Sequence, residues 1–115
     1  MALGRWLVVG MVALLGSAPA QGEEILERGS WQPPETLTEA VQRPAFNALL
    51  SEYAGTANGR VEIAHGGGAE GSAWAGEVRD WLVAMGIPSS RIRLEPGLAD
   101  PGVLRLAVAA SGDPG

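Results

Sequence analysis

The sequence contains no cysteine and no lysine, and it has one histidine among its 115 residues. Without cysteine, disulfide bonds, thiolate metal sites and lipid attachment through a thioether are excluded. The eight basic residues are all arginine and are outnumbered by thirteen acidic residues, which leaves a net charge of −5. Nucleic-acid binding depends on neutralising phosphates, so this acidic chain is not expected to bind nucleic acid. One histidine and scattered carboxylates give no metal-ligand spacing, and no cofactor is expected.

A long hydrophobic run is also missing. The longest apolar stretch, residues 6–15, spans about ten residues, whereas a helix needs about 20 to cross a bilayer. Arg5 precedes this stretch and the small residues Ala18 and Ala20 follow it, which is the order of regions in an export signal. We therefore expect residues 1–20 to be a signal peptide cleaved after Ala20, and the remaining chain to be periplasmic without stable insertion in the membrane.

The rest of the sequence has room for one small domain. Residues 21–43 are polar and contain several glutamates, so we expect an extended lead-in segment with a short helix around 36–42 and with Trp31 docked on the core. Regular hydrophobic patterns fill residues 44–110, and we expect residues 111–115 to form a flexible tail.

The hydrophobic pattern of residues 44–110 predicts the order helix, strand, helix, strand, strand. Pro44 suits the first turn of the first helix, and Ser72 is the expected N-cap of the second helix, which Gly86 ends. A strand-helix-strand unit of this length makes a parallel crossover, after which the last strand returns antiparallel. The expected fold is a two-layer α/β or α+β sandwich with a small mixed sheet, helices on one face and charged, solvated residues on the other. The expected elements are a helix over 44–54, a strand over 60–64, a helix over 73–85 and strands around 92–94 and 104–108, and the charged face carries Glu62, Arg91, Arg93, Glu95 and Arg105.

The sharpest chemical feature is the run His65-Gly66-Gly67-Gly68, directly after the first predicted strand. The same four residue types form the oxyanion loop in one group of lipases and esterases, but that chemistry needs a nucleophile. The sequence has no Gly-x-Ser-x-Gly motif, and its one histidine cannot be both loop marker and general base, so no enzyme activity is expected. Two interpretations stay open: a tight turn in which His65 satisfies backbone groups, or a nest of free N–H groups that binds the carboxylate of a peptide or cell-wall fragment.

Trp74 and Trp81 lie seven residues apart on one helical stripe, so we expect them to pack in the core. Trp74 is also close to the glycine run, where an exposed ring would form a stacking platform for a sugar or a peptide. A ligand that quenches Trp74 fluorescence would favour the exposed ring over the ring packed in the core.

Several stretches of residues 44–109 follow the order of elements in a known family. They are the helix Ala45–Tyr53, the strand Arg60–His65 with its terminal histidine, the helix end Trp81–Ile87, and the strand and loop Arg91–Pro101. In these stretches the chain resembles a shortened OmpA-like domain, the periplasmic module by which outer-membrane and motor proteins hold peptidoglycan. The resemblance implies an α/β fold, a periplasmic location and contact with the cell envelope.

The chain departs from the OmpA-like pattern at the residues that bind the ligand. Members that hold peptidoglycan use an Asp and an Arg to grip the zwitterionic diaminopimelate, and the matching positions here are Gly67 and Trp74. Arg79 and Glu70 would replace these charges only in a rebuilt loop. The family's first strand is also missing, unless residues 24–28 supply it.

We therefore expect a non-catalytic periplasmic domain that acts as an accessory or binding module and contacts the cell wall or an envelope protein. The alternative is a protein-interaction subunit of a secretion or pilus assembly, without wall binding, that uses the open sheet face and the polar N-terminal segment. The expected partner is a peptidoglycan fragment or an envelope protein, and the expected ligand-binding residues are His65, Gly66, Gly67, Gly68, Ser72, Trp74 and Arg79.

Overall fold

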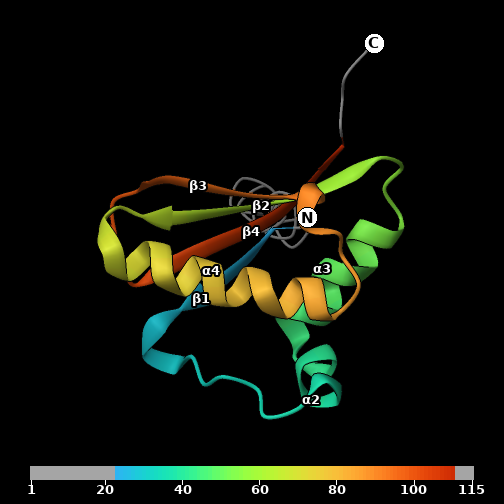
Figure 1. Ribbon diagram of the computed structural model, residues 1–115, viewed down its shortest axis with the longest axis horizontal. Helices are drawn as coiled ribbons and strands as arrows, with labels where there is room; N and C mark the ends of the chain where they lie inside the picture. The colour runs from blue at the N-terminus through green and yellow to red at the C-terminus, as the bar shows by residue number, and fades with distance from the viewer. Residues whose placement is uncertain (1–22, 111–115) are drawn as a thin grey trace, which may run out of the picture.

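The computed structural model describes residues 23–110 of the chain (Figure 1). The expected signal peptide 1–20 with its cleavage position, and the expected tail 111–115, lie outside the described residues. The elements follow one another as β1 (Glu24–Glu27), the 3₁₀ turn η1 (Arg28–Ser30), α2 (Leu37–Gln42), α3 (Pro44–Ala54), β2 (Gly59–Gly66), α4 (Gly68–Ala84), the 3₁₀ turn η2 (Ser89–Arg91), β3 (Ile92–Leu98) and β4 (Val103–Ala110).

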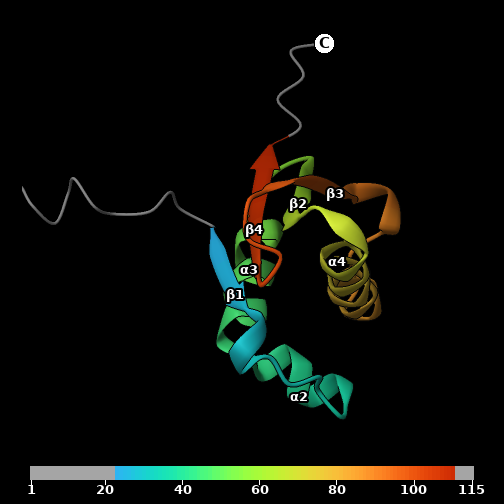
Figure 2. The ribbon, with the colours of Figure 1, turned by 90° about the vertical axis from the view of Figure 1, so that its left-hand side faces the viewer.

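The strands form one four-stranded mixed sheet in the order β1-β4-β2-β3. β2 and β3 are parallel and are joined through α4, whereas β4 is antiparallel to both of its neighbours, β1 and β2. α3 and α4 lie on the same side of this sheet (Figure 2). The small two-layer α+β fold with a mixed sheet is therefore as predicted, and the parallel crossover through a helix is confirmed.

The core lies between the sheet and the helices α3 and α4. Strand alternation places Val61 and Ile63 of β2 beside Leu104 and Leu106 of β4 on the helix-facing side, where all four side chains are buried. Burial of a large apolar side chain stabilises a fold by about 1.5–3 kcal/mol, so this layer is a major part of the driving force for folding. The helices contribute the large buried side chains Phe46, Leu49, Trp74, Val78 and Leu82.

A further strand, β1, precedes the expected order of elements and lies inside the segment 21–43. It pairs antiparallel with β4, and its residue Leu26 lies opposite Leu104. The last strand, β4, consequently inserts between β1 and β2. β1 has only four residues with glutamate at both ends, so its sequence carries no strand signal of its own and its pairing depends on β4.

Helix α4 begins at Gly68, four residues before the expected N-cap Ser72. The N-cap residue is Gly67, and Ser72 lies within the helix with an exposed side chain, so the prediction that Ser72 caps the helix is wrong. Glycine is a weak helix former, which hid the first turn from the sequence pattern. The other end agrees with the expected stop, because Gly86 has a φ of +113°, a conformation that favours glycine.

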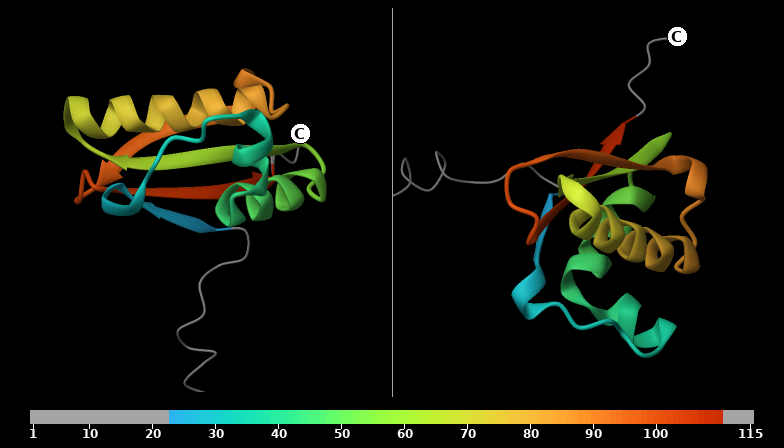
Figure 3. Two further views of the ribbon diagram at one scale, coloured as in Figure 1. Left: turned by 90° about the horizontal axis from the view of Figure 1, so that it is seen from below. Right: turned by 60° about the vertical axis from the view of Figure 1, so that its left-hand side comes forward.

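The segment after β1 is fixed on the helical side by Trp31. Its ring packs against Phe46 of α3 and Trp74 of α4, with ring centroids 6.1 Å apart in both pairs. The indole N–H of Trp31 donates to the carboxylate of Glu77 at 3.3 Å. Figure 3 (left) shows the segment between η1 and α2 crossing the helical side between α3 and α4. The expectation that Trp31 docks on the core is confirmed, and the short helix expected around 36–42 is α2.

The sheet face opposite the helices carries the expected charged residues, which form ion pairs. The pairs are Arg60 with Glu62, Arg93 with Glu95, and Arg105 with Glu23, at N–O distances of 3.0, 3.7 and 3.0 Å. Arg91 differs from the expectation, because it lies in η2 and its guanidinium donates to the carbonyl of Gly59 at 3.4 Å. Exposed ion pairs contribute about 0–1 kcal/mol each, so this face is chiefly solvated surface.

Candidate functional site

His65 ends the alternating pattern of β2 and faces the helices. Its side chain is 5% exposed, and Nδ1 lies 2.8 Å from the carbonyl oxygen of Gly66. A carbonyl only accepts hydrogen bonds, so Nδ1 carries the proton and donates this one. The geometry matches the interpretation in which His65 satisfies a backbone group of the turn, and the ring is not offered at the surface.

The glycines of this loop have different roles. A Cβ added at Gly66 would lie 2.5 Å from Cα of Pro101, which is in the loop between β3 and β4. A Cβ added at Gly71 would overlap the carbonyl oxygen of Gly66. These two glycines therefore let the end of β2, the β3–β4 loop and the start of α4 touch through their backbones. Gly67, by contrast, has nothing within 4 Å of an added Cβ, and Gly68 has a φ of +91°, which favours glycine whatever the space around it.

The other expected ligand-binding residues lie apart from His65. Trp74 is 2% exposed and packs in the core, so the interpretation of Trp74 as an exposed stacking platform is wrong. Arg79 lies eleven residues beyond Gly68 on α4, or about 16 Å along the helix axis. Its guanidinium donates to Asp80 at 3.4 Å. The structure keeps His65 and the glycine run together at the junction of β2 and α4, but it does not bring Trp74 or Arg79 to the surface of that junction.

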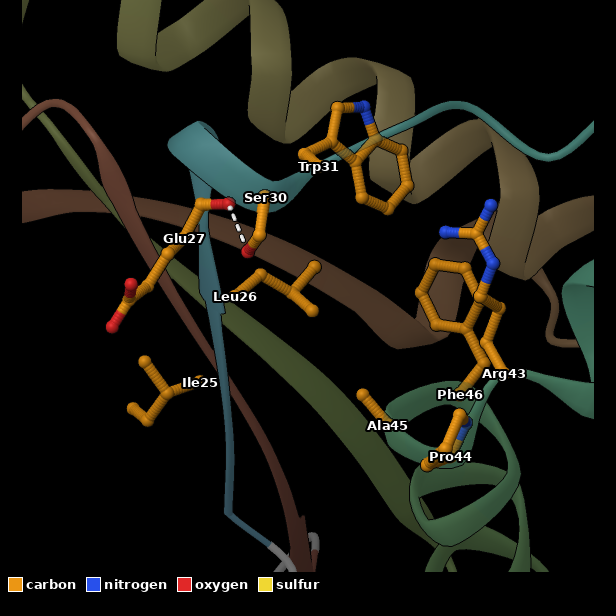
Figure 4. A pocket seen from close by; sticks show the side chains of 9 residues that line it. All are labelled: Ile25, Leu26, Glu27, Ser30, Trp31, Arg43, Pro44, Ala45 and Phe46. Atoms are coloured by element: carbon orange, nitrogen blue, oxygen red, sulfur yellow. Dashed lines mark hydrogen bonds between the residues drawn. The ribbon is translucent and has the colours of Figure 1, made fainter.

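A pocket that the sequence did not predict lies between β1, η1 and the first turn of α3. Its volume is about 330 Å³, at the lower end of the range of about 300–1,000 Å³ for ligand pockets. Figure 4 shows Leu26, Trp31 and Phe46 around this space, with Ile25 and Glu27 on the opposite side of β1. The lining residues are Ile25, Leu26, Glu27, Ser30, Trp31, Arg43, Pro44, Ala45 and Phe46.

The outer edge of β1 is free of any strand within residues 23–110, because β1 is the last strand of the sheet there. The N–H of Arg28 donates to the carbonyl of Gly102 at 2.8 Å, one residue beyond the last pair of the β1–β4 register. Because hydrogen bonds alternate along an antiparallel strand, the backbone groups of Ile25 and Glu27 point away from β4. The hydroxyl of Ser30 donates to the carbonyl of Glu27 at 3.3 Å. The N–H and C=O of Ile25 and the N–H of Glu27 are thus presented at the free edge.

The rim of the pocket carries charges that are balanced on one side only. Arg43 is paired with Glu39 at 3.1 Å. A hydrogen bond from the N–H of Glu35, followed by the one from Arg43, lowers the pKa of the Glu39 carboxyl below its ordinary value. On β1, neither Glu24 nor Glu27 forms an ion pair with any residue in the range 23–110. Of these two, Glu27 lines the pocket, so the β1 wall carries a carboxylate that is unpaired within this range.

No protein-family model and no curated protein matches this chain. The resemblance to OmpA-like domains therefore rests on the quoted residues alone. Within residues 23–110, no helix is both long and apolar enough to span a bilayer. In the same range, no three acidic or histidine side chains lie together as a metal site would require.

The walls of the pocket come from segments that are apart along the chain, which is why the sequence did not predict it. Residues 25–31 meet residues 43–46 because β1 pairs with β4, near the other end of the described chain, and because Trp31 packs against Phe46. A partial signal was present, since Ile25, Leu26 and Trp31 are among the few large apolar residues of a polar segment. Such residues indicate a segment that is attached to the core.

Proposed function

We propose that this chain is a non-catalytic binding module of the bacterial cell envelope, which holds a partner protein at the pocket beside the free edge of β1. The observation that carries the proposal is the combination of an apolar pocket with a strand edge that presents backbone hydrogen-bonding groups. A free edge next to side-chain pockets is the arrangement by which several domains bind extended segments of other proteins. Of the expectations from the sequence, this favours the protein-interaction alternative, in which the open sheet face and the polar N-terminal segment make the contact. β1 belongs to that segment.

The envelope location is supported by the export-signal pattern of residues 1–20 and by the OmpA-like resemblance. The OmpA-like pattern includes a first strand, for which residues 24–28 were the candidate in this sequence. β1 occupies Glu24–Glu27. The non-catalytic role is supported by His65, whose ring is buried and donates to a backbone carbonyl.

Binding of the cell wall in the OmpA-like manner has less support. The two charges that the family uses fall at Gly67 and Trp74, and Trp74 packs against Trp31 in the core. Restoring the pair by Gly67→Asp and Trp74→Arg would bury an uncompensated charge, which costs about 3–5 kcal/mol. A change that would supply wall binding is therefore expected to unfold the chain first.

Site-specific photo-crosslinking in the native bacterium tests where the partner binds. Benzoylphenylalanine replaces Ile25 on the edge of β1 or, as a control, Val83 on α4, whose side chains are 51% and 39% exposed. We expect protein adducts from position 25 that position 83 does not give. Equal adducts from both positions, or none from position 25, contradict the proposal.

Co-sedimentation with isolated sacculi tests the cell wall as the alternative partner. We expect the purified chain to stay in the supernatant, because the Asp and Arg positions of the OmpA-like pattern are Gly67 and Trp74. A chain that pellets with the sacculi would overturn the choice of a protein partner in favour of wall binding.

A further inference from the structure

The pocket and the free edge of β1 form one surface, because Leu26 lines the pocket from the strand whose outer edge is open. We propose that the ligand of this surface is an extended peptide segment, with apolar and basic residues in alternation, that adds to β1 as a further strand of the sheet. The proposal rests on the proposed function and specifies the chemistry of the partner.

The backbone groups at the edge of β1 determine the conformation of the ligand. The N–H and C=O of Ile25 and the N–H of Glu27 point away from β4, and their spacing matches that of a neighbouring strand. Only an extended chain presents its own N–H and C=O groups with this repeat. An added strand would continue the sheet beyond β1 without displacing a bond between β1 and β4.

The pocket determines the side chain that anchors the ligand. Side chains of an added strand alternate between the two faces of the sheet, so every second one would lie beside Leu26 on the helix-facing side. The walls there include the rings of Trp31 and Phe46 and the methyl group of Ala45, around a volume of about 330 Å³. These walls fit an apolar side chain such as leucine or phenylalanine.

The charge of β1 determines the neighbours of that anchor. Glu27 lies on the opposite side of β1 from Leu26 (Figure 4), is exposed, and has no ion-pair partner within residues 23–110. A lysine or arginine next to the anchor would fall on the same face as Glu27 and pair with it across the strands. A second copy of this chain is a poorer occupant, because it would bring Glu24 and Glu27 against the same carboxylates in a protein with a net charge of −5.

Two fluorescently labelled peptides of about six residues test this chemistry. One alternates lysine with leucine, the other has each lysine replaced by glutamate, and binding to the purified chain is followed by fluorescence anisotropy. We expect the lysine peptide to bind at least about tenfold more tightly, and Glu27→Arg to reduce that ratio by about two- to fivefold. Equal affinity for the two peptides, or a ratio unchanged by Glu27→Arg, overturns the charge complementarity.

Substitutions at Ile25 separate strand addition from unspecific attraction to an acidic protein. Ile25→Pro removes an N–H at the free edge, where proline is tolerated, and Ile25→Val is the matched control that keeps it. We expect Ile25→Val to bind the lysine peptide like the unaltered chain, and Ile25→Pro to lose about tenfold or more in affinity. Equal binding by both variants overturns strand addition. Circular dichroism checks that Ile25→Pro is folded; if it is not, slowed hydrogen exchange at the N–H of Ile25 in the unaltered chain with the lysine peptide bound decides for strand addition, and unchanged exchange decides against it.

The outcomes distinguish this proposal from the proposed function. Crosslinks from position 25 in the cell, together with no preference for the lysine peptide, would overturn the ligand chemistry and leave the docking surface in place. A dimer of the purified chain, detected by light scattering and abolished by Ile25→Pro, would make a second copy the occupant and overturn the choice of partner.

Discussion

Alanine at Gly71 and alanine at Gly76 should change the stability of the protein in opposite directions. Both residues lie inside α4, where alanine is favoured over glycine by about 0.8–1 kcal/mol. At Gly76 an added Cβ has nothing within 4 Å, so we expect nearly the full gain. At Gly71 the Cβ would overlap the carbonyl oxygen of Gly66, and overpacking of this kind costs about 1–3 kcal/mol. Gly71→Ala should therefore be less stable than Gly76→Ala by about 1–3 kcal/mol.

Urea unfolding followed by tryptophan fluorescence measures this difference, because Trp31 and Trp74 lose their mutual contact when the helix leaves the sheet. The slope of the free energy against urea should be the same for both variants, so that a shifted midpoint reports stability alone. If Gly71→Ala is stabilised as much as Gly76→Ala, α4 can move away from β2 without a loss of stability. The packing role assigned to Gly71 would then be wrong.

Trp31→Ala should lower the free energy of unfolding by about 2–4 kcal/mol, because its half-buried ring joins the segment after β1 to both helices; urea unfolding checks this. Trp74→Arg should abolish the folded circular-dichroism spectrum, whereas Gly67→Asp, where space is open, should change stability by less than about 0.5 kcal/mol. The carboxylate of Glu39 accepts a hydrogen bond from the N–H of Glu35, which lowers the pKa of Glu39. The stabilisation that this ionised carboxylate gives to α2 is therefore complete above the ordinary pKa of 4.5 and is lost at lower pH. The amide shift of Glu35, followed by NMR, should therefore titrate with a midpoint below 4.5, and a midpoint at or above 4.5 would contradict this.

The elements that the sequence predicted well have strong local signals. α3 begins at Pro44 and is capped by Gly55, and between them buried Phe46 and Leu49 keep the helical spacing. β2 alternates buried and half-buried residues from Gly59 to His65, which is the pattern that identified it as a strand. Where the period of the apolar residues equals the period of the backbone, the sequence is sufficient to locate an element.

The elements that the sequence did not predict depend on contacts between distant segments. β1 is a strand because β4 offers it a partner, and its own four residues give no periodic signal. The first turn of α4 is helical although it contains Gly68 and Gly71, and Gly71 packs against the end of β2. In both places tertiary contact outweighs local propensity.

At the candidate site, too, the sequence showed the local pattern but not the contacts between distant segments. A glycine run has the same composition whether its N–H groups hold a ligand or its lack of side chains lets two backbones meet, so the sequence left both interpretations open. The position of Pro101 against Gly66, which decides for backbone packing there, is set by the β3–β4 loop. The pocket beside β1 has no motif at all, because its walls meet only in the folded chain.

Amide hydrogen exchange at Ile25 is the most direct test of the claim that the edge of β1 is the recognition surface. In the free protein, the N–H of Ile25 should exchange fast and that of Leu26, which points to β4, should exchange slowly. A saturating amount of the peptide that alternates lysine with leucine should slow exchange at Ile25 and leave Leu26 unchanged. If Ile25 exchanges at its free rate while the peptide is bound, the peptide lies elsewhere and the edge of β1 is not the recognition surface.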